Sequence, residues 1–276
     1  MAYYLKQGQS SIFHKIKIVG NECEINIKNI EKVAKKMKKK GITPVILSKN
    51  LKENLKLIEA LNDFDITILD GKWLMQYLIQ EIIDYIQEQN LDEISLLVND
   101  LTEEVKQNII EFASRYKRIR IVTNHAEKFK RLEKELYEQK GIAIILTNNK
   151  KRAISKSKLI VNFDFVQETI NEYNIEENAI IINLGDKIKI NRKRFSGTII
   201  TDYEVEFCEI SENTELELRD MLNKENEFSL KEMLEGKIYE NSLNRLNLGT
   251  YRTVKETINK YNIKIKELYG INGKIQ

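Results

Sequence analysis

Between Ile94 and Leu184 the chain alternates short apolar runs with polar segments of helical length. A run such as Ile94-Ser95-Leu96-Leu97-Val98 is almost continuously apolar, which is typical of strands whose sheet is covered by helices on both faces. This alternation predicts an α/β fold with a doubly wound, mostly parallel sheet. We expect strands at 94–98, 119–123, 142–146, 159–162 and 179–183, and helices at 102–117, 125–140, 150–157 and 165–174.

The turn after the first of these runs contains no glycine: it reads Val98-Asn99-Asp100-Leu101-Thr102. Dinucleotide-binding folds need glycines there, because backbone amides must approach a pyrophosphate closely at a helix amino terminus. Three carboxylates, Asp100, Glu103 and Glu104, would repel a phosphate at this point but would suit the positive end of a helix. The sequence therefore predicts a degenerate Rossmann-like domain that lacks its phosphate-binding loop.

A chain of 276 residues is long enough for two domains, each with its own core. We expect a small α/β domain at 1–71, a linking helix at 72–90, the Rossmann-like domain at 91–210 and a helical segment at 211–276. The small domain is expected to contain a hairpin over 13–27, a helix over 29–39 ended by Gly41, a strand over 43–47, a helix over 51–61 and a strand over 66–69.

Patterns after residue 185 predict additions to these domains. Short strands are expected at 188–190, 198–200 and 203–207, on either side of a basic turn at 191–194. Ser229 and Glu232 have the spacing of a capping box at a helix start.

Two segments resemble a known family. They are Ile121-Val122-Thr123-Asn124-His125-Ala126-Glu127-Lys128-Phe129, followed by Leu132, and Ser157-Lys158-Leu159-Ile160-Val161-Asn162. They resemble the second-strand and fourth-strand segments of the shikimate dehydrogenase and glutamyl-tRNA reductase group, and the order of domains over residues 40–207 is also similar. The resemblance implies NAD(P) as a cofactor. In that group an arginine contacts the extra phosphate of NADP, whereas His125 stands at that position and carries only a partial positive charge near neutral pH.

Few other residues indicate catalysis or metal binding. His14 and His125 are the only histidines, and neither has the neighbours of a catalytic triad. Cys23 and Cys208 cannot form a zinc site or a disulfide framework, so we expect buried free thiols. Three aspartates near the strand at 66–69 are expected to cap helices and turns rather than hold a metal ion: Asp63, Asp65 and Asp70.

The charge balance does not identify a polyanionic partner, because 45 basic residues face 42 acidic ones. Basic clusters at 35–40 and 192–194 are interpreted as solvated faces, with phosphate or nucleic-acid contact as the alternative. Polar residues interrupt the most apolar helical segment, 73–86, so we expect no membrane span. Residues 1–8 do not resemble a secretion signal, which predicts a cytoplasmic location.

Three functions follow from these patterns. The first is a binding or structural role, with an unknown protein or small molecule as partner and no cofactor. The second is an atypical NAD(P)-dependent dehydrogenase with a cleft at the strand ends, formed by Asn99, Thr102, Thr123, Asn124 and Asn162. The third is DNA binding through a helix-turn-helix at 246–258, which Glu256 disfavours because it would face phosphates. We favour the binding or structural role.

Overall fold

The computed structural model describes residues 13–18, 21–26, 29–86, 91–190, 195–209, 212–244 and 250–275. The chain divides into two compact units, each assembled from two stretches of sequence. Unit 1 consists of Met1–Leu74 and Val205–Lys264, and unit 2 consists of Met75–Glu204 and Ile265–Gln276. The division falls within two long strands, so these strands contribute residues to both units.

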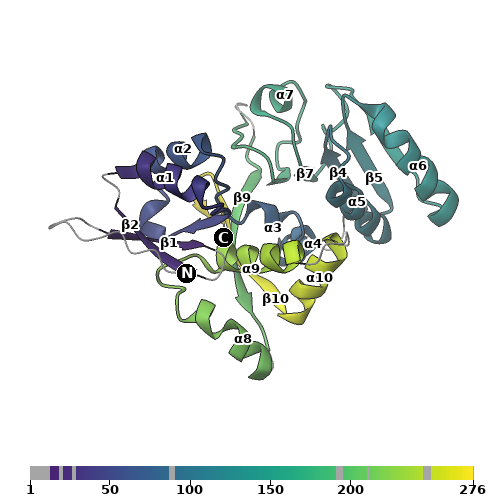
Figure 1. The fold of residues 1–276 in the computed structure, drawn as a ribbon. Helices are drawn as coiled ribbons and strands as arrows, with labels where there is room; N and C mark the ends of the chain where they lie inside the picture. Colours follow the sequence, from purple (N-terminus) through teal and green to yellow (C-terminus); the bar gives the residue numbers. More distant parts are fainter. Residues whose placement is uncertain are drawn as a thin grey trace. The chain divides into compact units, whose positions relative to one another are not determined.

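Unit 1 contains a three-stranded antiparallel sheet in the order β2-β1-β3 (Figure 1). Strands β1 (Phe13–Ile18) and β2 (Asn21–Asn26) form the predicted hairpin, and β3 (Val45–Leu47) pairs with the other side of β1. The predicted strand at 66–69 is reduced to a single parallel bridge between Val45 and Ile68.

Helices α1 (Ile30–Lys39) and α2 (Leu55–Asp63) supply the remaining core of this part of unit 1. Gly41 follows α1 with a φ of +64°, as expected of a helix terminator. Helix α2 begins later than the predicted residue 51, and Leu55 in its first turn is 70% exposed while Leu57, Ala60 and Leu61 are buried. Asn54 caps this helix by accepting a hydrogen bond from the Leu57 N–H, and a short 3-10 turn, η2 (Lys49–Leu51), precedes it.

Three helices from the second stretch complete unit 1: α8 (Glu212–Leu222), α9 (Leu230–Asn244) and α10 (Thr250–Lys260). After its first residue α9 is buried on all sides for more than a turn, since residues 231–236 are all buried. Gly236 brings this helix close to β3, because a Cβ atom there would lie 3.0 Å from the Ile46 side chain.

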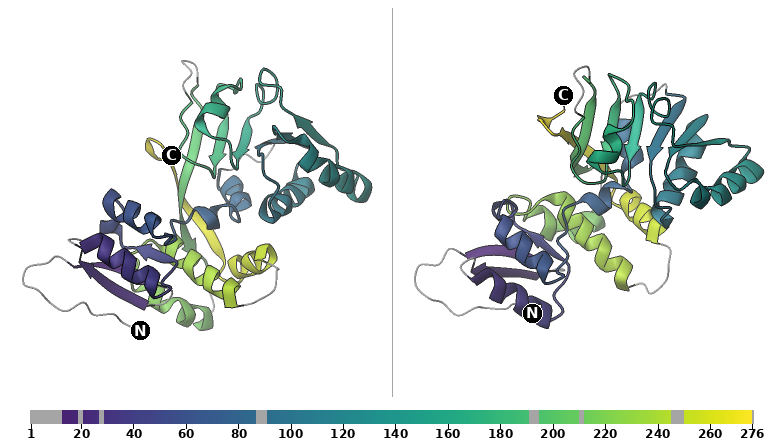
Figure 2. Two further views of the ribbon diagram at one scale, coloured as in Figure 1. Left: turned by 45° about the horizontal axis from the view of Figure 1, so that its top comes forward. Right: turned by 90° about the horizontal axis from the view of Figure 1, so that it is seen from above.

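Unit 2 is built on parallel strands, as the sequence predicted. Strands pair in the order β6-β5-β4-β7-β8-β9, and every pair among them is parallel. Their bounds are β4 (Glu93–Leu97), β5 (Arg118–Val122), β6 (Ile144–Thr147), β7 (Leu159–Asn162), β8 (Ile180–Asn183) and β9 (Thr198–Phe207). Figure 2 shows these strands side by side in teal and green. The chain builds outward from β4 in one direction and then returns to its other side, so the strand order reverses between β4 and β7.

The helices that connect these strands are α5 (Glu103–Arg115), α6 (Ala126–Lys140) and α7 (Gln167–Asn171). The predicted helix at 150–157 is wrong, since turns and one bridge between Ile154 and Ile175 occupy that stretch. The single linking helix predicted at 72–90 is also wrong: α3 (Lys72–Met75) and α4 (Ile79–Ile86) are separate, and residues 87–90 lie outside the described chain.

The end of the chain is not wholly helical, which corrects the expectation for 211–276. Strand β10 (Ile263–Gly270) adds to the free side of β9, and the short β11 (Gly273–Lys274) pairs antiparallel with it. The predicted strands at 198–200 and 203–207 are one continuous strand, β9, whereas 188–190 form no strand. The basic turn at 191–194 lies outside the described residues. Over the described chain, no helix combines the length and apolar character needed to cross a bilayer.

Candidate functional site at the carboxyl ends of the parallel strands

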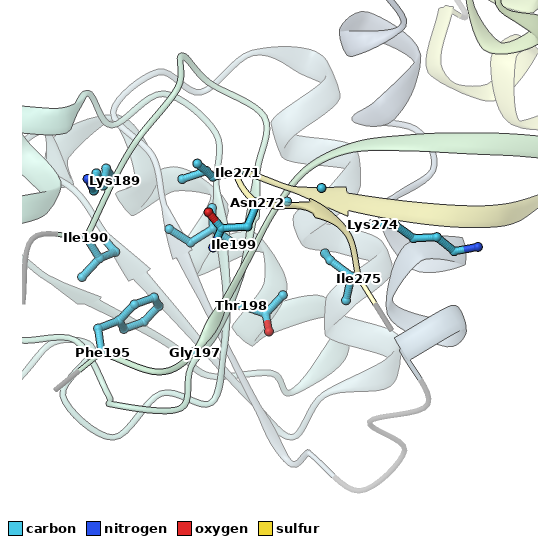
Figure 3. A pocket seen from close by; sticks show the side chains of 12 residues that line it. Lys189, Ile190, Phe195, Gly197, Thr198, Ile199, Ile271, Asn272, Lys274 and Ile275 are labelled. Carbon is cyan, nitrogen blue, oxygen red and sulfur yellow. The ribbon is translucent and has the colours of Figure 1, made fainter.

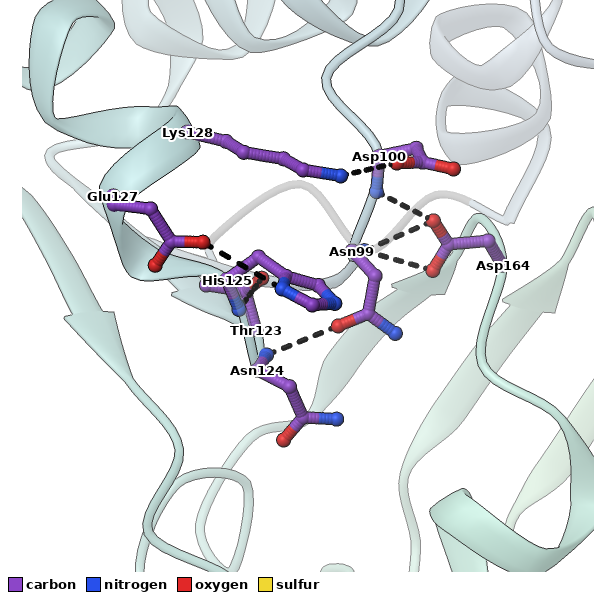
Figure 4. A network of polar contacts seen from close by, with 8 residues as sticks. All are labelled: Asn99, Asp100, Thr123, Asn124, His125, Glu127, Lys128 and Asp164. Carbon is purple, nitrogen blue, oxygen red and sulfur yellow. Dashed lines mark hydrogen bonds and ion pairs between the residues drawn. The ribbon is translucent and has the colours of Figure 1, made fainter.

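The strand reversal places the ends of β4, β5 and β7 next to one another. Residues 98–102, here called the β4 turn, leave β4 at this edge and lead into α5. Figure 4 shows the polar side chains that gather there. In open parallel sheets this edge, at the point of reversal, is where ligands bind.

Asp164, which follows β7 by two residues, binds the backbone of the β4 turn. Its two carboxylate oxygens each lie 2.9 Å from the Asn99 backbone nitrogen, and Oδ2 lies 2.8 Å from that of Asp100. Both N–H groups therefore donate to a carboxylate of the same chain. In dinucleotide-binding proteins, backbone N–H groups that follow the first strand of a parallel sheet bind phosphate.

Burial and hydrogen bonding act in opposite directions on Asp164. Burial raises the pKa of this carboxyl and is the largest influence, while the two amide hydrogen bonds lower it. The neighbouring charges of Asp100 and Lys128 also oppose each other, since the first raises the pKa and the second lowers it. The net result is a pKa above the ordinary value for aspartate.

The side chain of Asp100 pairs with a lysine on α6. Lys128 Nζ lies 2.6 Å from Asp100 Oδ1 (Figure 4). This hydrogen bond lowers the pKa of Asp100 and raises the pKa of Lys128. The positive charge that could attract a phosphate to this edge is thus already paired with a carboxylate.

Two of the predicted site residues meet at this edge. The Asn99 side-chain oxygen accepts a hydrogen bond from the Asn124 N–H at 3.0 Å, which joins the β4 turn to the end of β5. The other two polar residues of these strand ends serve local structure. Thr102 caps α5 by accepting from the Val105 N–H at 3.3 Å, and Thr123 is buried and accepts from the His125 N–H at 3.0 Å.

The fifth predicted residue, Asn162, does not face solvent. Its side chain is fully buried, and its amide nitrogen donates to Asn183 Oδ1 (2.7 Å) and to the Phe165 carbonyl (2.9 Å). Its oxygen accepts from the Phe165 N–H at 2.9 Å. Because these bonds fix the loop of residues 163–165, Asn162 positions Asp164 instead of contacting a ligand itself.

Sequence reasoning did not identify Asp164. The available signal was its place directly after a buried strand that neighbours β4, opposite a turn without glycine. A carboxylate at that place can substitute for a bound anion, whereas the sequence alone does not show in which direction it points.

A second group of charged residues lies inside unit 1, on α9, and was also missed. Glu235, only 1% exposed, accepts hydrogen bonds from the Gly71 N–H (2.7 Å) and the Leu74 N–H (3.1 Å). These amides lie at the start of α3, where a helix lacks internal acceptors. Burial raises the pKa of Glu235 to about 7, against the effect of the amide hydrogen bonds.

Glu232, one turn earlier on α9, is buried beside Lys52. Its Oε1 lies 2.5 Å from Lys52 Nζ, whereas its Oε2 and the Ser229 hydroxyl make no hydrogen bond within the described chain. The predicted capping box between Ser229 and Glu232 is therefore absent. Burial raises the pKa of Glu232 to about 7, although Lys52 lowers it. Since these side chains are enclosed, they connect parts of unit 1 and are not placed to act on a substrate.

A cavity of about 320 Å³ lies elsewhere in unit 2, beside the start of β9 and the β10–β11 hairpin (Figure 3). Its side chains are mainly apolar: Ile190, Phe195, Ile199, Ile271 and Ile275. Lys274, at one side, is paired with Glu267 at 2.8 Å. The described residues that line it include no carboxylate, histidine or cysteine, and its polar side chains are those of Lys189, Thr198, Asn272 and Lys274.

Metal and thiol chemistry have little support among the described residues. No three His, Cys, Asp or Glu side chains in that part of the chain are grouped to hold a metal ion. Asp65 pairs with Lys38 at 2.7 Å, and Asp70 accepts from the Lys72 N–H at 3.0 Å. Cys208 is a free thiol but only partly buried, so its predicted burial is wrong. The side chains of Cys23 and His14 lie outside the described residues.

The sequence matches no protein-family model, and no curated protein is significantly similar to it. The resemblance to the shikimate dehydrogenase and glutamyl-tRNA reductase group therefore remains a prediction. At its key position, His125 precedes α6 with an exposed ring, and its Nδ1 lies 3.5 Å from Glu127.

Proposed function

We propose that unit 2 is a doubly wound, Rossmann-like domain whose phosphate position is filled by Asp164. Counting the parallel strands along the chain from β4, their spatial order is 3-2-1-4-5-6, which is the order of dinucleotide-binding domains of this class. In this proposal the protein acts in the cytoplasm through binding or a structural interaction and does not transfer hydride. Its partner is a protein or a small molecule bound without a dinucleotide cofactor.

One observation carries this proposal: the Asp164 carboxylate accepts hydrogen bonds from both the Asn99 and the Asp100 amides. A pyrophosphate at the β4 turn would have to displace this carboxylate and approach Asp100 as well. Charge repulsion and the loss of existing hydrogen bonds both oppose that exchange. The turn also has side chains where close approach of a phosphate requires glycine.

The test is a fluorescence titration of the full chain with NADH and NADPH. We expect no saturable enhancement for the wild-type protein, and weak enhancement at most for Asp164→Ala, which exposes the two amides. Asp186→Ala, a change at an exposed carboxylate of the same unit, is the matched control and should behave like the wild type. Saturable binding of either cofactor by the wild-type protein with micromolar affinity would overturn the proposal.

The second candidate is the atypical NAD(P)-dependent dehydrogenase. It is favoured by the hydrogen bond from the Asn124 backbone N–H to the Asn99 side chain, which brings the ends of β4 and β5 together at the strand reversal. If the wild-type protein binds a dinucleotide there, replacing both asparagines by alanine should weaken binding. Unchanged affinity in that double variant would exclude this location.

A further inference from the structure

Strand β6 forms one edge of the sheet in unit 2. It pairs with β5 on one side, and within the described residues no strand pairs with its other side. An open edge presents unpaired N–H and C=O groups, to which another strand can add. Proteins usually protect such edges with charged side chains, proline, a bulge or a very short strand.

None of the chemical protections is present along β6. The nine residues from Gly141 to Asn149, Gly-Ile-Ala-Ile-Ile-Leu-Thr-Asn-Asn, contain neither a charge nor a proline, in a chain that is 32% charged. Ile145, in the middle of the strand, is 41% exposed. Tyr137, near the end of α6, is 65% exposed. Apolar side chains and an open backbone edge therefore occur together.

The opposite edge of the same sheet is different. It is formed by the two-residue strand β11, which includes Lys274, and by the part of β10 that β11 does not cover, which carries Lys266 and Glu267. A very short edge strand with a lysine resists the addition of another strand. The contrast within one sheet indicates that the open character of β6 is a local property of this edge.

We propose that β6 binds the β6 strand of a second copy of this chain, antiparallel to it and about a two-fold axis. A partner of identical sequence is favoured because an uncharged strand meets no repulsion from itself. An antiparallel arrangement about a two-fold axis is also closed, so that it ends at two copies. This inference does not depend on what the β4 turn binds.

The charges of α6, which connects β5 to β6, complement this arrangement. In its first half Glu127 is outnumbered by Lys128, Lys130 and Arg131. In its second half the balance is reversed, because three glutamates face two lysines: Glu133, Glu135 and Glu138 against Lys134 and Lys140. Three of these cations already form surface ion pairs within the chain, Lys128 with Asp100, Arg131 with Glu135 and Lys134 with Glu138, and such pairs are weak enough to exchange partners. Two such helices related by the same two-fold axis run in opposite directions, so the basic half of one is nearer the acidic half of the other.

Sedimentation velocity over a concentration series from about 1 to about 200 µM tests the proposal. The wild-type chain should form dimers as concentration rises. Ile145→Lys should weaken dimer formation about tenfold or more, because it places a charge on the edge strand. Ala143→Lys, at an exposed position just before β6, should act in the same direction with less risk to folding. Leu55→Lys, at the 70% exposed position on α2, is the control and should dimerise like the wild type.

Circular dichroism confirms that each variant is folded before it is compared. A wild-type chain that stays monomeric over the whole series would overturn the proposal. Equal dimer formation by the wild type and a folded Ala143→Lys variant would also overturn it, since association would then use another surface. Growth beyond a dimer would contradict the closed two-fold arrangement.

Discussion

Asp164 in unit 2 and Glu235 in unit 1 both accept hydrogen bonds from backbone amides near the start of a helix, but Glu235 is more deeply buried. Each carboxylate accepts hydrogen bonds from two backbone amides that are distant in sequence and lie ahead of or within the first turn of a helix. Asp164 is about half-buried, whereas Glu235 is 1% exposed. The two sites therefore separate the effect of capping from the effect of burial.

The difference shows what burial adds to a carboxylate that is already well hydrogen-bonded. Burial raises the pKa of both groups, and for Glu235 it raises the pKa to about 7. A half-buried carboxylate such as Asp164 can exchange its partners with water or with a ligand. The enclosed Glu235 cannot, so its role is to hold the start of α3 against α9.

The largest expected effect is a dependence of stability on pH that comes from the two buried glutamates of α9, Glu232 and Glu235. Glu232 and Glu235 have a pKa of about 7 in the folded protein, against 4.5 as the usual value. The folded state therefore binds their protons more tightly, so their contribution to stability is complete below about pH 4.5 and is lost as the pH rises through 7. The loss is about 3 kcal/mol for each carboxyl group.

Urea denaturation from pH 4.5 to 8 measures this dependence. The variant with both Glu232→Gln and Glu235→Gln should show a flatter profile than the wild type. Equal pH profiles for the wild type and this variant would mean that burial does not raise the pKa of Glu232 and Glu235. The contrast with Asp164 would then disappear.

The next largest effect on stability is expected from removing Glu235, the buried side chain that caps α3. Glu235→Ala removes the buried carboxylate that accepts from the Gly71 and Leu74 amides, so the free energy of unfolding at pH 5 should fall by about 3 kcal/mol. Glu235→Gln keeps one acceptor oxygen and should lose less. A loss below about 1 kcal/mol for the alanine variant would show that these hydrogen bonds do not hold α3.

Removing Asp164, the half-buried side chain that binds the β4 turn, should have a smaller effect on stability. Asp164→Ala exposes the Asn99 and Asp100 amides to water, which replaces the lost acceptor, so the expected loss is about 1 kcal/mol. Asp186→Ala should leave the unfolding transition unchanged, and equilibrium denaturation measures both. If Asp164→Ala were as damaging as Glu235→Ala, depth of burial would not be the property that distinguishes the sites.

The smallest effect on stability is expected from replacing Lys128, which pairs with Asp100 in the β4 turn. Lys128→Ala breaks the exposed pair with Asp100, and we expect no measurable change in thermal stability because surface ion pairs contribute little. A clear drop in melting temperature would instead assign Lys128 a part in holding the β4 turn.

The parallel strands β7 and β8 were predictable because each is a short, almost continuous apolar run, Leu159–Asn162 and Ile180–Asn183. The break between α3 and α4 was not, because Gln76, Tyr77 and Leu78 include neither proline nor glycine. Strand β10 did carry a signal: Ile263-Lys264-Ile265-Lys266 alternates with a period of two, and the isoleucines are buried.

The candidate site was predictable in position but only partly in composition. The strand ends were located correctly, and Asn99 and Asn124 do meet there. Asn162 has the same residue type and a similar place, yet its side chain turns inward to Asn183. Period and spacing indicate which strand end a residue occupies, but they do not determine whether its side chain points to solvent or to the next strand.

The most direct test of the role of the Asp164 carboxylate is the pH dependence of the Asn99 and Asp100 amide resonances in a nitrogen–proton correlation spectrum. Both should shift together with one midpoint, above the ordinary pKa of aspartate, and Asp164→Asn should abolish that transition. Near neutral pH, adding pyrophosphate should leave both resonances in place. Amides that ignore the titration of Asp164, or that move when pyrophosphate is added to the wild-type protein, would contradict the assignment of Asp164 as the anion of the β4 turn.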